Sequence, residues 1–507
     1  MTNKIPYIHP FLFAVFPVLY RYSFNIEKIS FSDTYTSFII FFLFTAILLL
    51  ISKFIFRNSQ KGGIIVSLFL LLFFSYGYVM DVIYVKWLHC KILPSPSHKY
   101  LLSIWFLFFI FGLYFVLKSK SVLINLNKIL LFVALILNGF SLFSIGIFES
   151  KRKDKYIINE ITETNSITPD LQRDIYYIIL DGYASSETLK NIYNFDNSSF
   201  LKQLENKGFY IANKSFSNYP ETFLSLASSL NLNYINDVGK ITGYESTDGI
   251  IPYKMVRNNQ TIKFLKSKGY KYIHYSSRHE ATDYNPHATI NFSVNFMNTY
   301  FIYLTEKTIL RAFIDLFEFD LKKSILFTID GLGKAHKIKG PKFIFAHIVS
   351  PHFPYLFGKN GETVSREKTS RDGNCWKQKE NYINQLQFVN KKILNLVDEI
   401  ISNSETLPVI IIQADHGPGS KFEKLSLCQT DSVTNTMLKE RMGIINAYFL
   451  PEICDANLYD SISPINTFRV IFNSYFNTHL ELLEDRCFFS TYEAPYKFVD
   501  VTEALKK

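Results

Sequence analysis

Four long apolar runs in the first 150 residues of this 507-residue chain constrain its fold more than any other feature. Each run is close to the roughly 20 apolar residues that cross the hydrocarbon core of a bilayer as a helix. We therefore predict a transmembrane helix for each of them. The four runs are Ser37 to Ser52, Gly63 to Met80, Leu101 to Leu117 and Ile129 to Phe148.

A fifth, shorter apolar stretch precedes these runs, from about Pro10 to Tyr20, and it contains Pro17 as well as Pro10. Such a stretch could also be a signal sequence or a segment that lies on the membrane surface. We favour a membrane-crossing helix, because no small-residue cleavage site follows the stretch and four spans come after it. The prediction is a five-helix transmembrane bundle over residues 1–148.

Two short loops of this region carry several basic residues and no acidic residue. Loops of this kind remain in the cytoplasm. Five spans with a cytoplasmic N-terminus place everything after Phe148 on the other side of the membrane. The basic residues are Lys53, Arg57 and Lys61 after the second span, and Lys118, Lys120 and Lys128 between the fourth and the fifth.

The formal net charge of +10 does not indicate a nucleic-acid partner. The lysines are spread over the whole chain, and no basic run interleaved with aromatic residues stands out. A cationic face beside anionic lipid head groups is the better interpretation. The five cysteines show no C-x-x-C pattern, and their spacing defines no disulfide pairing.

The remainder of the chain is typical of an α/β domain over residues 175–507, joined to the bundle by a polar linker at residues 149–174. Short apolar runs rich in β-branched and aromatic residues alternate with helical patterns, which indicates a mostly parallel sheet with helices on both faces. The predicted strands are Ile175 to Leu180, Gly208 to Ala212, Tyr270 to Tyr275, Lys342 to Ile348, Val409 to Ile412 and Gly443 to Leu450. The predicted helices are Phe200 to Lys207, Glu221 to Leu230, Thr261 to Lys268, Tyr382 to Ile401 and Pro464 to Phe476.

Three of these strands end in residues of the kind that bind metals. Asp181 follows the first strand, the pair His347 and His352 ends another, and Asp415-His416 ends a third. In a parallel sheet these ends share one edge, where ligands of α/β proteins bind. Carboxylates and imidazoles gathered there would suit a divalent cation of the zinc type.

Thr222 is the candidate for a fourth ligand. It follows Pro220-Glu221 at the start of a helical run, where backbone N–H groups and the helix dipole favour an anion. A hydroxyl bound to a metal loses its proton more easily and becomes a nucleophile at neutral pH. Together with Asp181, Asp415 and His416, this threonine forms the parts of a phosphoryl-transfer site.

Each candidate also has a purely structural interpretation. Asp181 before Gly182 could be a turn residue, Thr222 could be a helix cap, and His347 taken alone is more typical of a core histidine. Several further polar residues form a loop in which surface residues and substrate contacts are equally plausible. These are His274, Arg278, His279 and His287.

The order of these motifs resembles the alkaline phosphatase superfamily in its sulfatase-like branch. A strand ending in Asp is followed about forty residues later by a Thr, then by H-x-x-x-P-H-x-P, then by a strand with Asp-His-Gly. With its N-terminal anchor, the chain is similar to the membrane-bound transferases of that branch, such as lipoteichoic acid synthase and lipid A phosphoethanolamine transferase. Four stretches between Asp174 and Thr502 resemble bacterial membrane proteins described as sulfatase-like hydrolase/transferases, namely DIYYIILDGYA, NYPETFLSLASSLN, FAHIVSPHFPY and SPINTFR.

The resemblance implies a divalent metal, Zn or Mn, held by Asp181, Thr222, Asp415 and His416. It implies that Thr222 is the nucleophile and forms a phospho-threonine intermediate. His352, and with it His347, would contact the transferred group or a second metal. It further implies a multi-pass protein of the bacterial inner (plasma) membrane, whose periplasmic or extracellular domain acts on a phosphodiester of a membrane lipid or cell-envelope glycan.

Two departures from the family pattern refine this expectation. The C/S-x-P-x-R motif that sulfatases convert to formylglycine is absent, and Tyr219-Pro220-Glu221-Thr222 stands in its place, which disfavours sulfate ester hydrolysis. The known head-group transferases begin the site with Glu, whereas Asp181 resembles the phosphatase and phosphodiesterase members. Two alternatives therefore stay open: a phosphatase or phosphodiesterase for soluble substrates, and a catalytically degenerate partner of a membrane complex.

Overall fold

The protein, described by a computed structural model, divides into two compact units. The first comprises Met1–Arg152 and Met297–Phe319, and the second comprises Lys153–Phe296 and Asp320–Lys507. The structure describes residues 8–27, 29–90, 98–119, 123–151, 171–279, 281–294, 299–317, 321–364, 375–422, 433–453 and 457–506.

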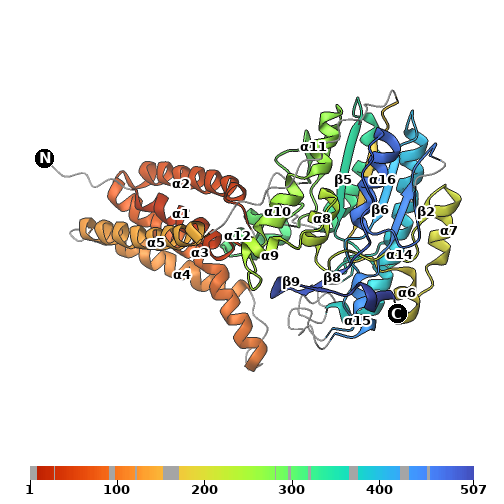
Figure 1. The fold of residues 1–507 in the computed structure, drawn as a ribbon. Helices are drawn as coiled ribbons and strands as arrows, with labels where there is room; N and C mark the ends of the chain where they lie inside the picture. The colour runs from red at the N-terminus through yellow and green to blue at the C-terminus, as the bar shows by residue number, and fades with distance from the viewer. Residues whose placement is uncertain are drawn as a thin grey trace. The chain divides into compact units, whose positions relative to one another are not determined.

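Long apolar helices make up most of the first unit (Figure 1). They are α1 (His9–Phe24), α2 (Tyr35–Phe56), α3 (Ser59–Cys90), α4 (His98–Lys118) and α5 (Leu123–Lys151), with a short 3₁₀ turn, η1 (Phe31–Thr34), before α2. Among the described residues, four stretches are long and apolar enough to cross a membrane: Phe31–Phe56, Ser59–Ile83, His98–Lys118 and Leu123–Ser150.

The predicted transmembrane helices are thus confirmed at four positions, but the count of five is not. Helix α1 has 16 residues. At 1.5 Å per residue it is about 24 Å long, which is shorter than the roughly 30 Å hydrocarbon core of a bilayer.

Polar contacts fix helix α1 against α3 and α5. At its start, the buried His9 ring bonds Ser67 Oγ through Nδ1 (2.7 Å) and Asn127 Oδ1 through Nε2 (2.8 Å). Near its end, the Tyr22 hydroxyl donates to a carboxylate oxygen of Glu149 at 3.4 Å. Asn127 lies in the second turn of α5 and Glu149 in its last turn. Helix α1 therefore packs alongside α5, and the two helices run in the same direction.

A segment from the middle of the sequence also folds into this unit. It contains α12 (Thr299–Thr305) and the 3₁₀ helix η2 (Ile309–Phe317). Apolar side chains of α12 share a core with α1, α2 and α3. The carboxylate of Asp81, on α3, accepts from Lys307 Nζ and from Arg311 Nη1, both at 2.5 Å. The membrane-type helices and this later segment are therefore one packed body.

A seven-stranded sheet organises the second unit, in the order β2-β7-β6-β1-β5-β3-β4. The neighbours from β6 to β4 pair in parallel, while β7 is antiparallel to both β6 and β2. The prediction of an α/β domain with a mostly parallel sheet is confirmed. The strands are β1 (Ile175–Leu180), β2 (Tyr210–Ile211), β3 (Lys271–Tyr275), β4 (Ile290–Phe292), β5 (Lys342–Ile348), β6 (Val409–Gln413) and β7 (Asn446–Phe449).

Helices cover both faces of this sheet (Figure 1). Alternate residues of β1 point into two separate cores, Tyr176 and Ile178 into one and Tyr177 and Ile179 into the other. Burial on both faces explains why the strands are almost continuously apolar. The first core includes α6 (Ser186–Tyr193), α7 (Ser198–Asn206), α13 (Leu321–Gly333) and α14 (Lys379–Asn403). The second includes α8 (Thr222–Asn231), α10 (Ile250–Arg257), α11 (Gln260–Ser267) and α16 (Pro464–Phe476).

Smaller elements complete the second unit. Strands β8 (Phe488–Thr491) and β9 (Ala494–Asp500) form a separate antiparallel hairpin. Short helices are α9 (Val238–Thr242), α15 (Asn435–Met442) and α17 (Thr502–Lys506). Most of the predicted linker, residues 152–170, lies outside the described residues.

Candidate metal centre

The central strand β1 brings the predicted site residues together. It lies between β5 and β6, and its Ile179 pairs in register with both His347 and Gln413. The chain segments that leave β1 and β6 therefore begin at the same edge of the sheet. Asp181 is the first residue after β1, and Asp415 is the second residue after β6.

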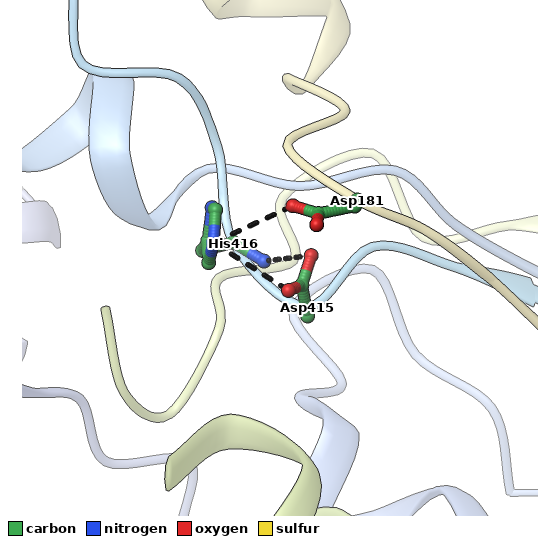
Figure 2. Close-up of side chains that lie close together, drawn as sticks. All are labelled: Asp181, Asp415 and His416. Atoms are coloured by element: carbon green, nitrogen blue, oxygen red, sulfur yellow. Dashed lines mark hydrogen bonds and ion pairs between the residues drawn. The ribbon is translucent and has the colours of Figure 1, made fainter. Parts of the chain in front are cut away.

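Two carboxylates and one imidazole meet at this edge in a buried cluster (Figure 2). The possible ligand atoms of Asp181, Asp415 and His416 all lie within 4.8 Å of one another. His416 Nε2 is 3.6 Å from Asp181 Oδ1 and 3.5 Å from Asp415 Oδ2. The hydroxyl oxygen of Thr222 lies 3.3 Å from the same nitrogen.

The hydrogen bonds of this cluster leave two carboxylate oxygens without a donor. Asp415 Oδ1 accepts from the backbone N–H groups of Gly182 (3.2 Å) and His416 (3.0 Å). Among the described residues, Asp415 Oδ2 and Asp181 Oδ1 are buried without a hydrogen-bond partner. His416 Nδ1–H donates to the Gly417 carbonyl at 2.9 Å, which leaves a lone pair on Nε2 when the ring is neutral.

The pKa values of His416 and Asp181 are both lowered, which favours cation binding by this cluster. Burial, together with the Arg441 guanidinium, lowers the pKa of His416 to about 4, so its ring is neutral at pH 7. Burial alone would raise the pKa of Asp181, but the rings of His352, His347 and His416 hold it well below the ordinary value. Two carboxylate oxygens thus lie close to a nitrogen lone pair that faces the Thr222 hydroxyl. These residues fit a divalent metal, which prefers such ligands.

Two glycines permit the close packing around the cluster. Gly182 has a φ of +69°, and a Cβ atom there would lie 2.8 Å from the Trp376 ring. A Cβ atom on Gly417 would lie 2.1 Å from the carbonyl oxygen of Glu440. Any side chain at either position would displace the loop that carries the neighbouring Asp or His.

Thr222 is the first residue of α8, and Glu221 is its N-cap residue. The carboxylate of Glu221 is buried, 3.5 Å from the guanidinium of Arg441. Burial raises the pKa of Glu221 to about 7, although Arg441 opposes this shift. Sequence reasoning missed this pair. Glu221 could have been suspected from its place beside Thr222, but Arg441 lies in a short polar helix that gives no such signal.

Two histidines, His347 within β5 and His352 in the loop after it, lie next to Asp181. His347 Nε2 is 3.4 Å from Asp181 Oδ2, and Asp181 raises the pKa of His347 against the effect of burial. The backbone N–H of His352 donates to the Asp181 carbonyl at 3.0 Å. The half-buried His352 ring lies with its centroid 6.2 Å from that of His416.

The other three histidines of the sequence prediction have different environments. His274 is buried on β3 and bonds the Thr282 carbonyl through Nε2 at 2.9 Å. The half-buried His279 ring lies 5.6 Å from the His347 ring, between centroids. His287 is exposed. The surface interpretation therefore holds for His287 alone, and His274 belongs to the interior beside the site.

A mostly parallel α/β sheet with carboxylates, an imidazole and a threonine hydroxyl beyond its strand ends is an arrangement of metal-dependent hydrolases and transferases. The family model described as Sulfatase matches residues 173–436, just over half of the chain. The chain belongs to the sulfatase family and is a sulfatase-like enzyme of the alkaline phosphatase superfamily, as the motifs predicted.

Several solved structures are similar to this chain at low sequence identity. The C-terminal periplasmic domain of EptC from Escherichia coli is 13% identical over 68% of this chain and 96% of that chain, with a TM-score of 0.44. Integral membrane lipooligosaccharide phosphoethanolamine transferase A (EptA) from Neisseria meningitidis is 11% identical over 92% of this chain and 95% of that chain, with a TM-score of 0.41. The C-terminal periplasmic domain of phosphoethanolamine transferase EptC from Campylobacter jejuni is 10% identical over 65% and 95%, with a TM-score of 0.40. No curated protein matches the chain.

Proposed function

We propose that this protein transfers or hydrolyses a phosphoryl-containing group, outside the cytoplasm and with a divalent metal, from a phosphodiester that is part of a membrane lipid or cell-envelope glycan. The observation that carries the proposal is the position of Thr222. Its hydroxyl oxygen lies 3.3 Å from His416 Nε2, beside the unpartnered oxygens of Asp181 and Asp415. The candidate nucleophile thus lies at the candidate cation site, next to its two carboxylates.

Asp181, Asp415, His416 and Thr222 would hold the cation, Zn or Mn. A bound divalent cation lowers the pKa of a coordinated hydroxyl and neutralises charge on phosphoryl oxygens. The carbonyl of Gly417 holds the His416 ring with its lone pair toward the site, which keeps this imidazole ready as a ligand.

The chain's own residues perform the covalent steps. Thr222 Oγ1 loses its proton to solvent and forms a bond to phosphorus, while the bond from phosphorus to the leaving oxygen breaks. His352 donates a proton to that oxygen. Water or an acceptor alcohol then gives its proton to His352 and attacks the phosphorus; the bond from phosphorus to Thr222 Oγ1 breaks, and this oxygen takes a proton from solvent. The first turn of α8 presents backbone N–H groups and the positive end of the helix dipole to the phosphoryl oxygens.

The basic loops support an extracytoplasmic catalytic domain in a bacterial inner (plasma) membrane. If the loop before α5 is cytoplasmic, the C-terminal end of α5 lies on the opposite side of the membrane, whether or not α1 also crosses it. The contacts of α1 with both ends of α5 favour α1 as a fifth crossing, with a cytoplasmic N-terminus. In this proposal residues 1–148 are the membrane domain, 149–174 the linker and 175–507 the catalytic domain, except for residues 297–319, which pack with the first unit. The tether keeps the site within reach of lipid head groups.

The test compares Thr222→Ala and Thr222→Ser with the wild type in the full-length protein, using bis-nitrophenyl phosphate and total membrane lipids as substrates. We expect Thr222→Ala to lose at least about 10³-fold in turnover, because removing a nucleophile costs other hydrolases more than that. Thr222→Ser should keep measurable activity. Unchanged turnover in Thr222→Ala would refute the proposal, and hydrolysis of the nitrophenyl ester without group transfer to lipid would favour a plain phosphodiesterase.

A further inference from the structure

A buried chain of polar side chains leads from Asp181 away from the candidate metal. His347 Nε2 is 3.4 Å from Asp181 Oδ2, and His347 Nδ1 is 2.8 Å from Thr282 Oγ1. Thr282 Oγ1 is 2.7 Å from Ser277 Oγ, which accepts from the backbone N–H of His279 at 2.9 Å. His347, Thr282 and Ser277 are all nearly inaccessible to solvent.

The donors in this chain have one consistent direction. The N–H of His279 can only donate, so Ser277 Oγ accepts from it and its own proton is free to reach Thr282. Thr282 then donates to His347 Nδ1, and the remaining proton of a neutral His347 lies on Nε2, facing Asp181. In the opposite direction Ser277 Oγ would accept twice, and its own proton would have no acceptor among the described residues.

Thr282 is also fixed by its backbone. Its carbonyl accepts from Ser277 N–H at 3.3 Å and from the His274 ring at 2.9 Å, and its N–H donates to the His279 carbonyl at 2.9 Å. These bonds fix the backbone of Thr282, and its hydroxyl is held by Ser277 Oγ and His347 Nδ1. A hydroxyl that donates its proton to one ring nitrogen leaves the ring proton on the other nitrogen, and so selects one imidazole tautomer.

We propose that Thr282, supported by Ser277, is a positioning residue for the metal centre: its hydroxyl sets the Nε2–H tautomer of His347, which directs that proton toward Asp181 Oδ2, 3.4 Å away, and leaves Oδ1 to the cation. The inference rests on the proposed function for the identity of the centre. It makes His347 an outer partner of a metal ligand, not a ligand itself. Outer partners of this kind usually contribute about 10–100-fold to metal affinity.

The first measurement needs no metal. Full-length, metal-free protein labelled with ¹⁵N-histidine is studied by solid-state NMR in lipid bilayers at about pH 8.5, two units above the ordinary histidine pKa. Because Asp181 raises the pKa of His347, the pH is then increased until the His347 signals no longer change and the ring is neutral. The His347 signals are assigned by their loss in His347→Asn. We expect a protonated Nε2 and an unprotonated Nδ1 in the wild type and in Thr282→Ser. A protonated Nδ1 in the wild type would overturn the proposal.

The second measurement is zinc affinity of the detergent-solubilised full-length protein by competition with a chelator. Thr282→Val removes the hydroxyl at constant shape and should weaken zinc binding by about 10–100-fold. Thr282→Ser should stay within a few-fold of the wild type. Thr261→Val is the matched control, because the Thr261 hydroxyl is equally buried. It donates to the Leu230 carbonyl of α8 at 2.8 Å instead of to a histidine ring.

The outcomes separate the two proposals. Equal zinc affinities for Thr282→Val and Thr261→Val would overturn the role of Thr282 while leaving the metal centre intact. A wild type that binds no zinc would instead contradict the proposed function, and the tautomer of the metal-free protein would still decide the role of Thr282. Loss of one of two bound zinc ions in His347→Asn would show that His347 is a direct ligand and would overturn the inference.

Discussion

Gln385 of helix α14 should be essential for the loop that carries His352. The buried Gln385 side chain accepts at Oε1 from the backbone N–H groups of Leu356 (2.6 Å) and Phe357 (3.2 Å). Its Nε2 donates to the carbonyls of His352 (2.8 Å) and Pro351 (3.2 Å). One amide therefore holds both sides of the loop that follows β5.

Gln385→Leu keeps the volume and removes all of these bonds. It leaves one buried and one partly buried N–H group unpaired, and each costs about 1–3 kcal/mol. We expect a loss of about 2–4 kcal/mol in the local opening free energy. Because 1.4 kcal/mol is a factor of ten, hydrogen exchange at Leu356 and Phe357 should become at least about 30-fold faster.

The assay is hydrogen–deuterium exchange of the full-length protein, read on peptides that contain these two amides. Gln387→Leu is the control, since Gln387 is a half-buried residue on the same helix. It should leave exchange at both amides unchanged. Exchange in Gln385→Leu equal to that in Gln387→Leu would refute the reasoning, and turnover should fall in Gln385→Leu alone.

Two further predictions concern other parts of the molecule. Asp81→Asn removes both ion pairs that hold the segment Met297–Phe319. Since all three side chains are partly exposed, we expect the free energy of unfolding to fall by about 1–2 kcal/mol and the melting temperature to fall by a few degrees. Asp237→Asn breaks a more exposed pair and should have almost no effect in the same thermal scan. Burial lowers the pKa of His274 to about 4 from 6.5, so the unfolded chain binds the extra proton first and the folded state loses stability as the pH falls from about 6.5 to 4. His274→Phe should therefore show about 2 kcal/mol less destabilisation than the wild type between pH 7 and pH 5 in denaturation scans, and an identical pH slope would contradict this assignment.

The parts of the fold that were predictable are those in which apolar patterning is strong. Strands β1, β5 and β6 are continuous apolar runs because both faces are buried, so their ends, and with them Asp181 and Asp415, could be located from the sequence. The short edge strand β4 has only partly buried residues and gave no pattern. The predicted strand Gly443 to Leu450 is shorter in the structure, because its first residues form only isolated bridges.

Long-range packing accounts for what the sequence did not reveal. The length of α1 is below that of a normal span, and its position depends on hydrogen bonds from His9 to α3 and α5 that no local pattern encodes. The same is true of Thr282 and His347, which are 65 residues apart. Residues 297–319 resemble an ordinary part of the catalytic sequence, and only their packing groups them with the first unit.

The central claim is that Thr222 carries the transferred group, and mass spectrometry of the Thr222 peptide tests it most directly. The full-length protein is incubated with total membrane lipids, stopped during turnover and digested. We predict a phosphorus-containing adduct on Thr222, whose mass identifies the donor group, and its absence from Thr222→Ala. An active wild type with unmodified Thr222 at every time point, or an adduct on another residue, would contradict the account.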